Sequence, residues 1–370
     1  MRKPTFAVIG AGCGGQAMAG HLASAGYDVT LWNRSYARIA PFQDRGFIEL
    51  QGEIRGVGRL SYIGTDLATA LADRDVIMIV TTATGHRPLA REMATLLRDG
   101  QVILLNPGRT FGALEFSRVV RQSGCAVEPI VAEASTLVYV SRVAVPGTAT
   151  IKAVKREVFV SAVRAEETPH LLSRLGGAYP QFVAAPSFLE TSLGNIGAIF
   201  HPTIALFNKH RICADEPFDF YTDGITREVA RFLARVDGEF QALARALDAR
   251  PLSVAEWLHS RYGLEPSDVY TMLRTNPSYQ DVKAPTTLDH RYLWEDIPMG
   301  LVPISELAKA VGIATPAIDH LIDEGSLALG RDFRTEGRTL ARLGLSPASV
   351  KEELRSIIRG GDRVPEGAHA

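Results

Sequence analysis

Short apolar runs alternate with helical patterns over the first half of the chain. Four runs are nearly continuous and rich in β-branched residues: FAVIG, DVTLW, VIMIVT and QVILLN. Strands of a parallel sheet that is covered on both faces have this pattern. Helical periodicity lies between them, as in residues 86–97, with Gly100 as the expected C-cap. The later runs AVEPIVAE, GTATIKAV and EVFVSAV are expected to extend the same sheet. Residues 1–183 are therefore predicted to form a doubly wound, mainly parallel α/β domain.

The pattern changes after QFVAAPSFLE. Helical periodicity dominates TREVARFLARVDGEFQALARALD, LSVAEWLHSRYG, SDVYTMLRT and ISELAKAVG, and alternation typical of strands almost disappears. We therefore predict a second, all-α domain over residues 184–360. Residues 361–370 are rich in Gly, Pro and charge and are expected to form a flexible tail.

Composition narrows the class of partner. The formal net charge of the 370 residues is −1, with 46% hydrophobic and 22% charged residues. This near-neutral charge gives no electrostatic reason to expect nucleic acid or an anionic membrane, so small molecules are the expected partners. The three cysteines form no CxxC pair or metal-ligand cluster, which favours a reduced, cytoplasmic setting without a metal site. No signal peptide or apolar run of membrane-spanning length is recognised.

A glycine-rich loop follows the first predicted strand. It satisfies G-x-G-x-x-G and opens the helical stretch GQAMAGHLASAG, the context in which this motif binds a dinucleotide in a Rossmann fold. A helix N-terminus offers unpaired N–H groups to a pyrophosphate, and glycine lets the phosphate approach the backbone. The alternative is a tight strand–helix turn without a ligand. The expected cofactor-binding residues of this loop are Gly10, Gly12, Cys13, Gly14 and Gly15.

The end of the second strand indicates which nicotinamide cofactor is bound. A site for NAD usually has an acidic residue there, which holds the ribose 2′-hydroxyl. This chain has Asn33, Arg34 and Ser35 instead. A guanidinium binds a 2′-phosphate that a carboxylate would repel, so NADP is the predicted cofactor. NAD is the alternative, with Arg34 as a solvated arginine stacked on adenine.

Two loops after later strands are expected to face the cofactor. TTATGH contains Thr82, and NPGRT contains Asn106 and Gly108. Such loops line the ligand crevice of doubly wound sheets, and Gly108 is expected to let the backbone approach the nicotinamide ribose. His86 is expected to be a surface residue at a helix N-terminus. The segment AEAST, residues 132–136, is a further candidate for substrate contact.

The segment GNIGAIFHPTIALFN places a histidine and a proline inside an apolar helix. One helical face collects Gly194, Gly197, Ala198, His201, Ala205 and Asn208. Small residues beside a titratable ring leave space for a ligand. The alternative is a core histidine that bonds a carbonyl, with small residues serving tight helix packing.

A charged stretch much further along the chain favours the ligand-site interpretation. DHRYLWEDIPMGLVP contains His290, Arg291, Glu295 and Asp296. A carboxylate beside an imidazole is expected to raise the histidine pKa towards the range useful for proton transfer. An arginine is a suitable partner for a substrate carboxylate. A solvated loop that caps the following helix is the alternative.

GNIGAIFHPTIALFN and RYLWEDIPMGLVP, together with the glycine loop, resemble the opine dehydrogenases, the family of the octopine, nopaline and N-(1-carboxyethyl)norvaline dehydrogenases. The predicted helical domain resembles that of 6-phosphogluconate dehydrogenase relatives. The family condenses an amino acid with a 2-oxo acid and reduces the imine with NAD(P)H. The resemblance implies that His201 is the catalytic histidine, Asp296 its carboxylate partner and Arg291 the residue that holds a substrate carboxylate. Asn208 is a further expected substrate-binding residue, and a homodimer is expected from related folds.

Two other functions stay open from the sequence. One is a 2-oxo acid or ketone reductase of the ketopantoate reductase or glycerol-3-phosphate dehydrogenase type, which needs no amine. The other is an NAD(P)-binding regulator without catalysis. The joint presence of His201, Arg291 and Asp296 argues against the regulator.

Overall fold

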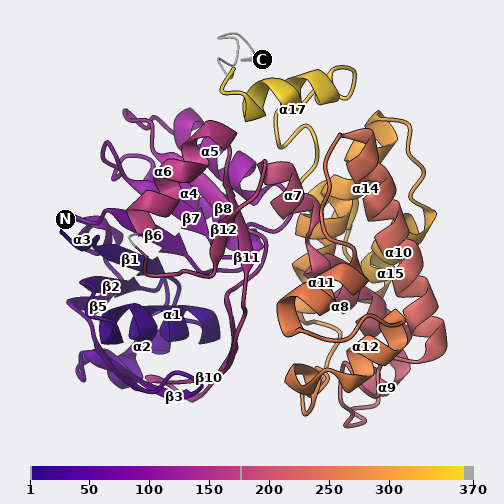
Figure 1. The fold of residues 1–370 in the computed structure, drawn as a ribbon, viewed down its shortest axis with the longest axis horizontal. Coiled ribbons are helices and arrows are strands. Elements are labelled where there is room, and N and C mark those ends of the chain that lie inside the picture. The colour runs from indigo at the N-terminus through magenta and orange to yellow at the C-terminus, as the bar shows by residue number, and fades with distance from the viewer. Residues whose placement is uncertain (1, 176, 362–370) are drawn as a thin grey trace.

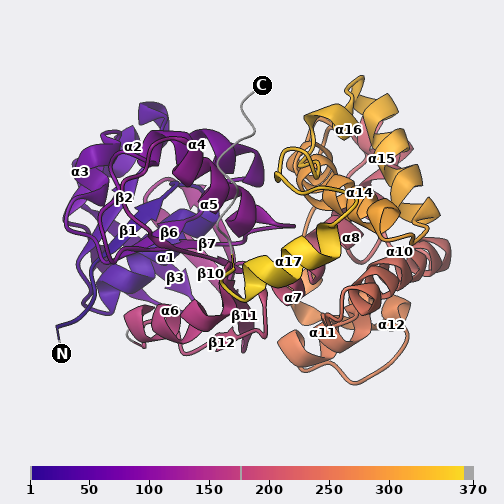
Figure 2. The same ribbon diagram turned by 90° about the horizontal axis from the view of Figure 1, so that it is seen from above.

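A computed structural model describes residues 2–175 and 177–361. An α/β domain and a helical domain lie side by side, and the chain returns at its end to the first domain through α17 (Val350–Ile358) (Figures 1 and 2). Ile357 of α17 lies in one cavity lining with Leu114 and Val163 of the α/β domain. The predicted tail falls largely outside the described residues, which end at residue 361.

The α/β domain is built on an eight-stranded sheet. Its order is β12-β11-β8-β7-β6-β1-β2-β5, and the only antiparallel pair among its described strands joins β8 to β11. The register aligns Phe6 with Val29 on one side and Val76 on the other. The four central strands are wholly buried, which explains their continuous apolar runs. The strands are β1 (Phe6–Ile9), β2 (Val29–Trp32), β5 (Tyr62–Gly64), β6 (Val76–Ile79), β7 (Val102–Leu105), β8 (Ile130–Ala134), β11 (Val158–Ala162) and β12 (Phe182–Ala184).

Helices connect and cover these strands as a doubly wound fold requires, which confirms the predicted fold class. The helix predicted over residues 86–97 ends earlier, at Met93, and continues as turns. The helices are α1 (Cys13–Ser24), α2 (Tyr36–Gln43), α3 (Leu67–Leu71), α4 (His86–Met93), α5 (Gly112–Gln122) and α6 (Thr168–Leu175).

A second, four-stranded sheet corrects one prediction. GTATIKAV does not extend the main sheet, because its strand β10 (Thr148–Val154) pairs with β3 (Phe47–Gly52) and β9 (Tyr139–Val145), and β4 (Gly56–Arg59) completes the sheet. Helix α1 lies between the two sheets (Figure 1). A Cβ added to Gly58 would lie 2.2 Å from the carbonyl oxygen of Gly20, so glycine allows β4 to cross α1 closely. Sequence alternation predicts a strand but not its partner.

The second domain is all-helical, as predicted. Helix α8 carries His201 and packs against α10, α13 and α15. The longest helix, α10, begins where the side chain of Thr226 accepts a hydrogen bond from the Val229 amide at 3.2 Å. The helices are α7 (Phe188–Leu193), α8 (Ile196–Phe207), α9 (Lys209–Cys213), α10 (Arg227–Ala246), α11 (Val254–Tyr262), α12 (Val269–Thr275), α13 (Arg291–Trp294), α14 (Val302–Ala310), α15 (Pro316–Leu329) and α16 (Phe333–Glu336), with a π-helical turn at Ile297–Leu301. None of the helices in the described part is long and apolar enough to cross a bilayer.

Candidate active site

The glycine loop has the shape that a dinucleotide needs. A Cβ on Gly15 would lie 1.7 Å from the carbonyl oxygen of Gly10, and Gly10 itself has a φ of +114°. These two glycines are therefore required by the strand–helix turn. Gly12 is different, because a Cβ added there would meet nothing within 4 Å. It caps α1 without a side-chain hydrogen bond, which leaves the first N–H groups of the helix open to a phosphate.

A cleft of about 690 Å³, the nucleotide cleft, extends from this loop past the end of β2. Asn33 supports the loop, because its Oδ1 accepts a hydrogen bond from the Ala11 amide at 3.0 Å. Arg34 and Ser35 are exposed at the cleft, and Arg38 of α2 joins them. The sequence interpretation missed Arg38, which lies in the first turn of α2, close after the end of β2.

A second cleft of about 470 Å³, the catalytic cleft, lies between the two domains. It shares Gly12, Val80, Thr81 and Thr82 with the nucleotide cleft, so the two adjoin at the glycine loop. The second domain contributes an aromatic wall: Phe200, Tyr221, Trp257, Tyr262, Tyr279 and Tyr292. Cofactor and substrate sites are commonly placed in this way at a domain interface.

His201 and Asp296 form a buried pair in the catalytic cleft. The imidazole Nδ1 lies 2.7 Å from Asp296 Oδ2, and Nε2 lies 3.0 Å from the hydroxyl oxygen of Tyr221. The ring of Tyr292 stacks on the imidazole with 4.2 Å between centroids. The ring of His201 is thus held on three sides, and Nε2 is the atom that faces the cleft residue Tyr221.

Electrostatics assign the protons in this pair. Burial raises the pKa of Asp296, but Arg109, His201 and Arg291 outweigh burial and lower the pKa to about 2. Burial lowers the pKa of His201, and Asp296 offsets that shift only in part. The net direction is opposite to the predicted rise. An ionised Asp296 therefore accepts the Nδ1 proton of a neutral imidazole, and Nε2 accepts the hydroxyl hydrogen of Tyr221, the position that a substrate donor would take.

Arg109, a residue that the sequence interpretation missed, joins the two domains at this pair. It comes from the NPGRT loop with a left-handed φ of +61°. Its Nη1 lies 3.1 Å from Asp296 Oδ1, and its Nε lies 3.5 Å from Glu295 Oε1. A Cβ on Gly197 would lie 2.3 Å from this Nη1, so the small face of α8 makes room for Arg109 as well as for the cleft.

Arg291 faces the catalytic cleft from α13. Its side chain is 43% exposed, although Nη1 lies 3.4 Å from Glu295 Oε2. Burial lowers the pKa of Arg291, but Glu295 and Asp296 outweigh it and raise the pKa above its ordinary value. Glu295 also accepts a hydrogen bond from the Ala83 amide at 2.9 Å, which ties the TTATGH loop to α13. Arg291 therefore keeps its charge and part of its donor set for a ligand.

The remaining predicted residues have different positions in the structure. Thr82 and Asn106 line the catalytic cleft, and their contact with a cofactor stays a prediction. Asn208 lies outside both clefts, because its Nδ2 donates to the carbonyls of Ile204 and Gly224 at 2.9 Å each. Gly108 packs against Glu133. A Cβ added to Gly108 would lie 2.4 Å from the Cβ of Glu133, so the small size of the glycine serves this packing. His86 is fully buried and is not the expected surface residue.

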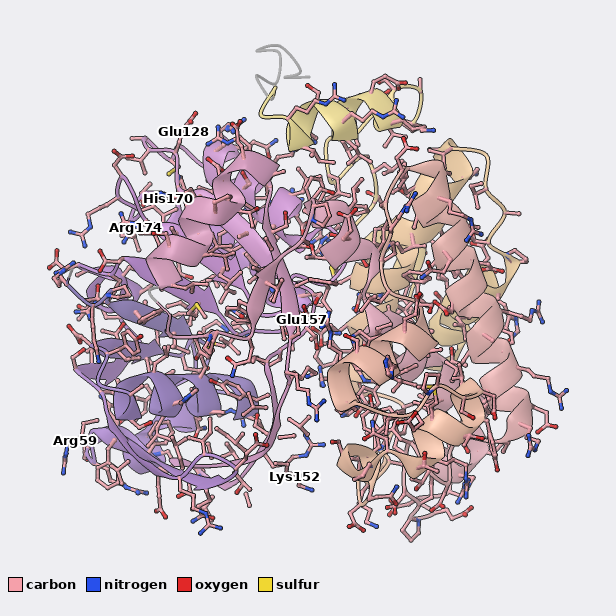
Figure 3. All side chains as sticks on the ribbon, in the orientation of Figure 1. Arg59, Glu128, Lys152, Glu157, His170 and Arg174 are labelled. Atoms are coloured by element: carbon pink, nitrogen blue, oxygen red, sulfur yellow. The ribbon has the colours of Figure 1, made fainter. Side chains whose placement is uncertain are left out.

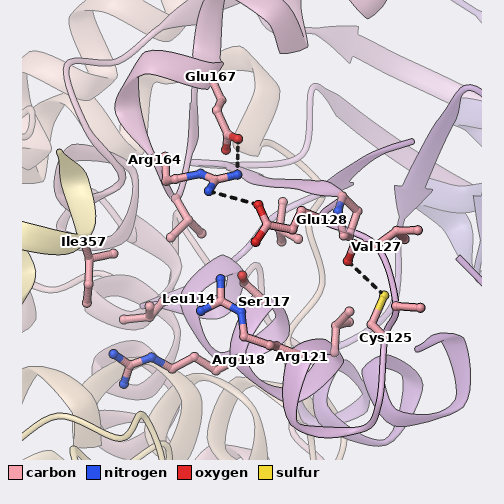
Figure 4. Close-up of a pocket in the computed structure, with 15 residues that line it drawn as sticks. Leu114, Ser117, Arg118, Arg121, Cys125, Val127, Glu128, Arg164, Glu167 and Ile357 are labelled. Carbon is pink, nitrogen blue, oxygen red and sulfur yellow. Dashed lines mark hydrogen bonds and ion pairs between the residues drawn. The ribbon is translucent and has the colours of Figure 1, made fainter. Parts of the chain in front are cut away.

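A further cavity of about 240 Å³ lies beside the start of β8, between α5 and the segment that follows β11 (Figure 4). Arg164 there already pairs with Glu167 at 2.5 Å and Glu128 at 3.5 Å. The described residues contain no cluster of three or more His, Cys, Asp and Glu side chains that could hold a metal. The catalytic cleft is therefore the candidate active site.

A dinucleotide loop beside a buried His–Asp pair defines the class of the protein, an NAD(P)-dependent oxidoreductase. Residues 5–107 match the NAD binding domain of 6-phosphogluconate dehydrogenase, and residues 184–329 match the alpha-helical domain of NAD/NADP octopine/nopaline dehydrogenase. The opine dehydrogenase of Arthrobacter sp. (strain 1C) is 40% identical over 347 residues, which cover 94% of this chain and 96% of that protein. The chain belongs to the opine dehydrogenase family.

More distant relatives share the whole architecture. The octopine dehydrogenase of Pecten maximus is 25% identical over 309 residues, 75% of this chain and 76% of its own. A structure of octopine dehydrogenase with NADH and L-arginine has a TM-score of 0.77 at 22% identity and covers 99% of this chain and 100% of its own. Yersinopine dehydrogenase with NADP+ bound has a TM-score of 0.74 at 17% identity, with coverage of 97% and 98%. These likenesses show the fold.

Proposed function

We propose that the enzyme joins the amine of an amino acid to a 2-oxo acid and reduces the product with NAD(P)H, so that it acts on a CH–NH bond. The observation that carries this proposal is the buried His201–Asp296 pair beside Arg291, in a cleft that adjoins the glycine loop. Family membership supports the same reaction. Gly12 and the open start of α1 fit the pyrophosphate of the cofactor, which when bound supplies a hydride.

The resting charges suit the first proton transfer. A neutral His201 accepts a proton at Nε2 from the substrate ammonium, and the free amine then attacks the carbonyl carbon. The adjacent Asp296 stabilises the imidazolium that forms. His201 returns the proton to the carbonyl oxygen, which becomes a hydroxyl group. The imidazole then carries a second proton from the newly bonded nitrogen to this hydroxyl group, water leaves, and an iminium carbon is ready for reduction. Arg291 holds the carboxylate of the oxo acid beside His201, because a guanidinium matches a carboxylate geometrically.

The decisive experiment follows the absorbance of the reduced nicotinamide. Purified enzyme is mixed with NADPH or NADH, pyruvate or glyoxylate, and pooled L-amino acids, with each component omitted in turn. Oxidation that requires both the oxo acid and the amino acid supports the proposal. Oxidation without an amine would favour a ketone reductase instead. Tight cofactor binding without any oxidation would favour a regulator. His201→Ala is the control, and its rate should fall by roughly 10²- to 10⁴-fold because a general acid–base is lost.

The cofactor preference is a proposal of its own. Arg34, Ser35 and Arg38 stand at the end of β2, where an NAD site usually has a carboxylate. Two guanidinium groups there favour the 2′-phosphate of NADP over the bare hydroxyl of NAD.

A homodimer and a cytoplasmic location are also proposed. Related folds suggest the dimer. The free state of Cys13, Cys125 and Cys213 fits a reducing compartment. Light scattering of the purified chain tests the dimer, and a particle of monomer mass would exclude it.

A further inference from the structure

The catalytic cleft contains a cation that the mechanism above does not use. Lys155 lies in the connection from β10 to β11 and lines the cleft with only 6% of its surface exposed. Its ammonium donates to the carbonyl oxygen of Leu137 at 2.6 Å, the one hydrogen bond found for it among the described residues. An ammonium carries three donors, so one carbonyl leaves it undersatisfied.

The surroundings of Lys155 contain no compensating charge. No carboxylate among the described residues forms an ion pair with its ammonium, and the charged group that acts on it most strongly is the cation Arg261 of α11. Arg261 is itself paired with Glu157, which Figure 3 labels at the junction of the two domains. Burial, with Arg261 adding to it, lowers the pKa of Lys155 to about 7. An unpaired buried ammonium is costly, and an anionic ligand would remove that cost.

The position of Lys155 indicates which ligand it meets. The side chain of Leu137 packs on the glycine loop, since a Cβ on Gly14 would lie 2.7 Å from Leu137 Cδ2. Lys155 therefore lies on the wall of the catalytic cleft that the α/β domain provides. It is not among the residues that line the nucleotide cleft, and Trp257 and Tyr262 of α11 share its cleft. This location points to the substrate rather than to the adenosine half of the cofactor.

The substrates have two carboxylates, and the arginine and lysine residues of the cleft lining are Arg109, Arg142, Lys155 and Arg291. Arg109 is already paired with Asp296, and Arg142 is exposed on β9 and donates to the carbonyl of Ser141, so Lys155 and Arg291 are the two candidates. The oxo acid carries its carboxylate directly on the carbonyl carbon, where His201 acts. Tyr292, the residue after Arg291, stacks on the imidazole of His201 with 4.2 Å between centroids, so Arg291 belongs to the turn of α13 that lies against this ring. Arg291 is thus the partner of the oxo acid, and the carboxylate of the amino acid is left for the second cation.

We propose that Lys155 binds the carboxylate of the amino-acid substrate and so places its amine towards His201. The proposal rests on the proposed function and assigns a specificity role within it. The aromatic residues Trp257 and Tyr262 then lie beside the amino-acid side chain.

The first test compares Lys155→Met with the wild type on paired substrates. One substrate is an L-amino acid and the other is its primary amide, which lacks the negative charge. The KM for the amino acid should rise roughly 10- to 100-fold in the variant, as for loss of a charged hydrogen bond. The KM for the amide should stay within about two-fold, and so should the Kd of NADPH. Lys152 is exposed on β10, three residues before Lys155, so Lys152→Met is the matched control and should change nothing (Figure 3). Lys155→Arg should restore part of the loss.

A binding measurement separates this proposal from the proposed function. Iminodiacetate, which carries a carboxylate on each side of a secondary amine, is titrated calorimetrically into the NADP⁺-loaded enzyme. Its affinity should fall tenfold or more in Lys155→Met even if no substrate pair is turned over by the wild type. Equal binding to both proteins, absence of binding to either, or an equal KM change for amino acid and amide would overturn the assignment. Absence of turnover together with the expected binding loss would contradict only the proposed function.

Discussion

Replacing Asp296 with asparagine tests the electrostatic account of the active site most directly. The substitution keeps the size of the side chain but removes the charge that faces Nδ1 of His201 at 2.7 Å and Nη1 of Arg109 at 3.1 Å. An amide can present either its oxygen or its NH₂ group to the imidazole. The ring therefore loses the partner that fixes its tautomer and stabilises its protonated form.

The size of the effect follows from the contact between the carboxylate and the imidazole. Burial raises the pKa of Asp296, but Arg109, His201 and Arg291 outweigh burial, so the carboxyl group is ionised. Its 2.7 Å contact with Nδ1 is a hydrogen bond to a charged group, and such bonds contribute about 1.5–3 kcal/mol. If most of that interaction is present in the transition state, kcat should fall roughly 100-fold. The loss should not exceed that of His201→Ala, because both act through one imidazole.

The assay is the steady-state rate of NADPH oxidation across pH, with thermal unfolding and NADPH affinity as controls for folding. Burial lowers the pKa of His201 and Asp296 opposes that effect, so the variant should move the acidic limb of kcat/KM to lower pH. The double variant of His201→Ala and Asp296→Asn should be within about three-fold of His201→Ala alone. A folded Asp296→Asn enzyme that keeps more than a third of wild-type kcat would refute the reasoning.

Three further results are expected. Burial lowers the pKa of His86 from 6.5 to about 3, so the unfolded chain binds this proton first and stability falls as pH drops below about 6.5. His86→Leu should reduce the loss between pH 7 and 5 in urea unfolding by about 2 kcal/mol, and an unchanged loss would contradict this pKa. Arg34→Ser should raise KM for NADPH roughly tenfold and leave KM for NADH nearly unchanged; equal changes would remove the proposed 2′-phosphate contact. Gly12→Ala should fold but bind NADPH more weakly, whereas Gly15→Ala should fail to fold, because only the second Cβ collides with the backbone; circular dichroism and cofactor titration compare them.

The sequence predicts parts of the site that lie in continuous segments. His201 and Asp296 stand in motifs with a clear pattern, and their contact in the structure matches the expected pairing. Arg109 was missed although its loop was recognised, because a left-handed φ of +61° directs its side chain into the other domain. Tyr221 and Lys155 enter the cleft from segments without a motif. Such residues come together only through tertiary packing, which hydrophobic periodicity and secondary-structure propensity do not encode.

The same limit explains the misplaced His86. The segment HRPLAREM has the charge of an exposed helix, and both Arg91 and Glu92 are indeed exposed. His86 is buried, and Gly112 lies against its ring. A Cβ added to Gly112 would lie 3.3 Å from Nδ1 of His86. The charged pattern predicts an exposed helix as a whole, whereas the first residue of α4, His86, already belongs to the interior.

Contacts between the domains make the acid–base chemistry depend on how the domains meet. His201 and Asp296 belong to the helical domain. Arg109, the cation that lowers the pKa of Asp296 most, comes from the α/β domain. The Ala83 amide of the cofactor-side loop bonds Glu295, the residue before Asp296. Separation of the domains would therefore remove one of the cations that lower the pKa of Asp296 and at the same time move the glycine loop away from His201. The charge state needed for proton transfer and the position needed for hydride transfer are set by one interface.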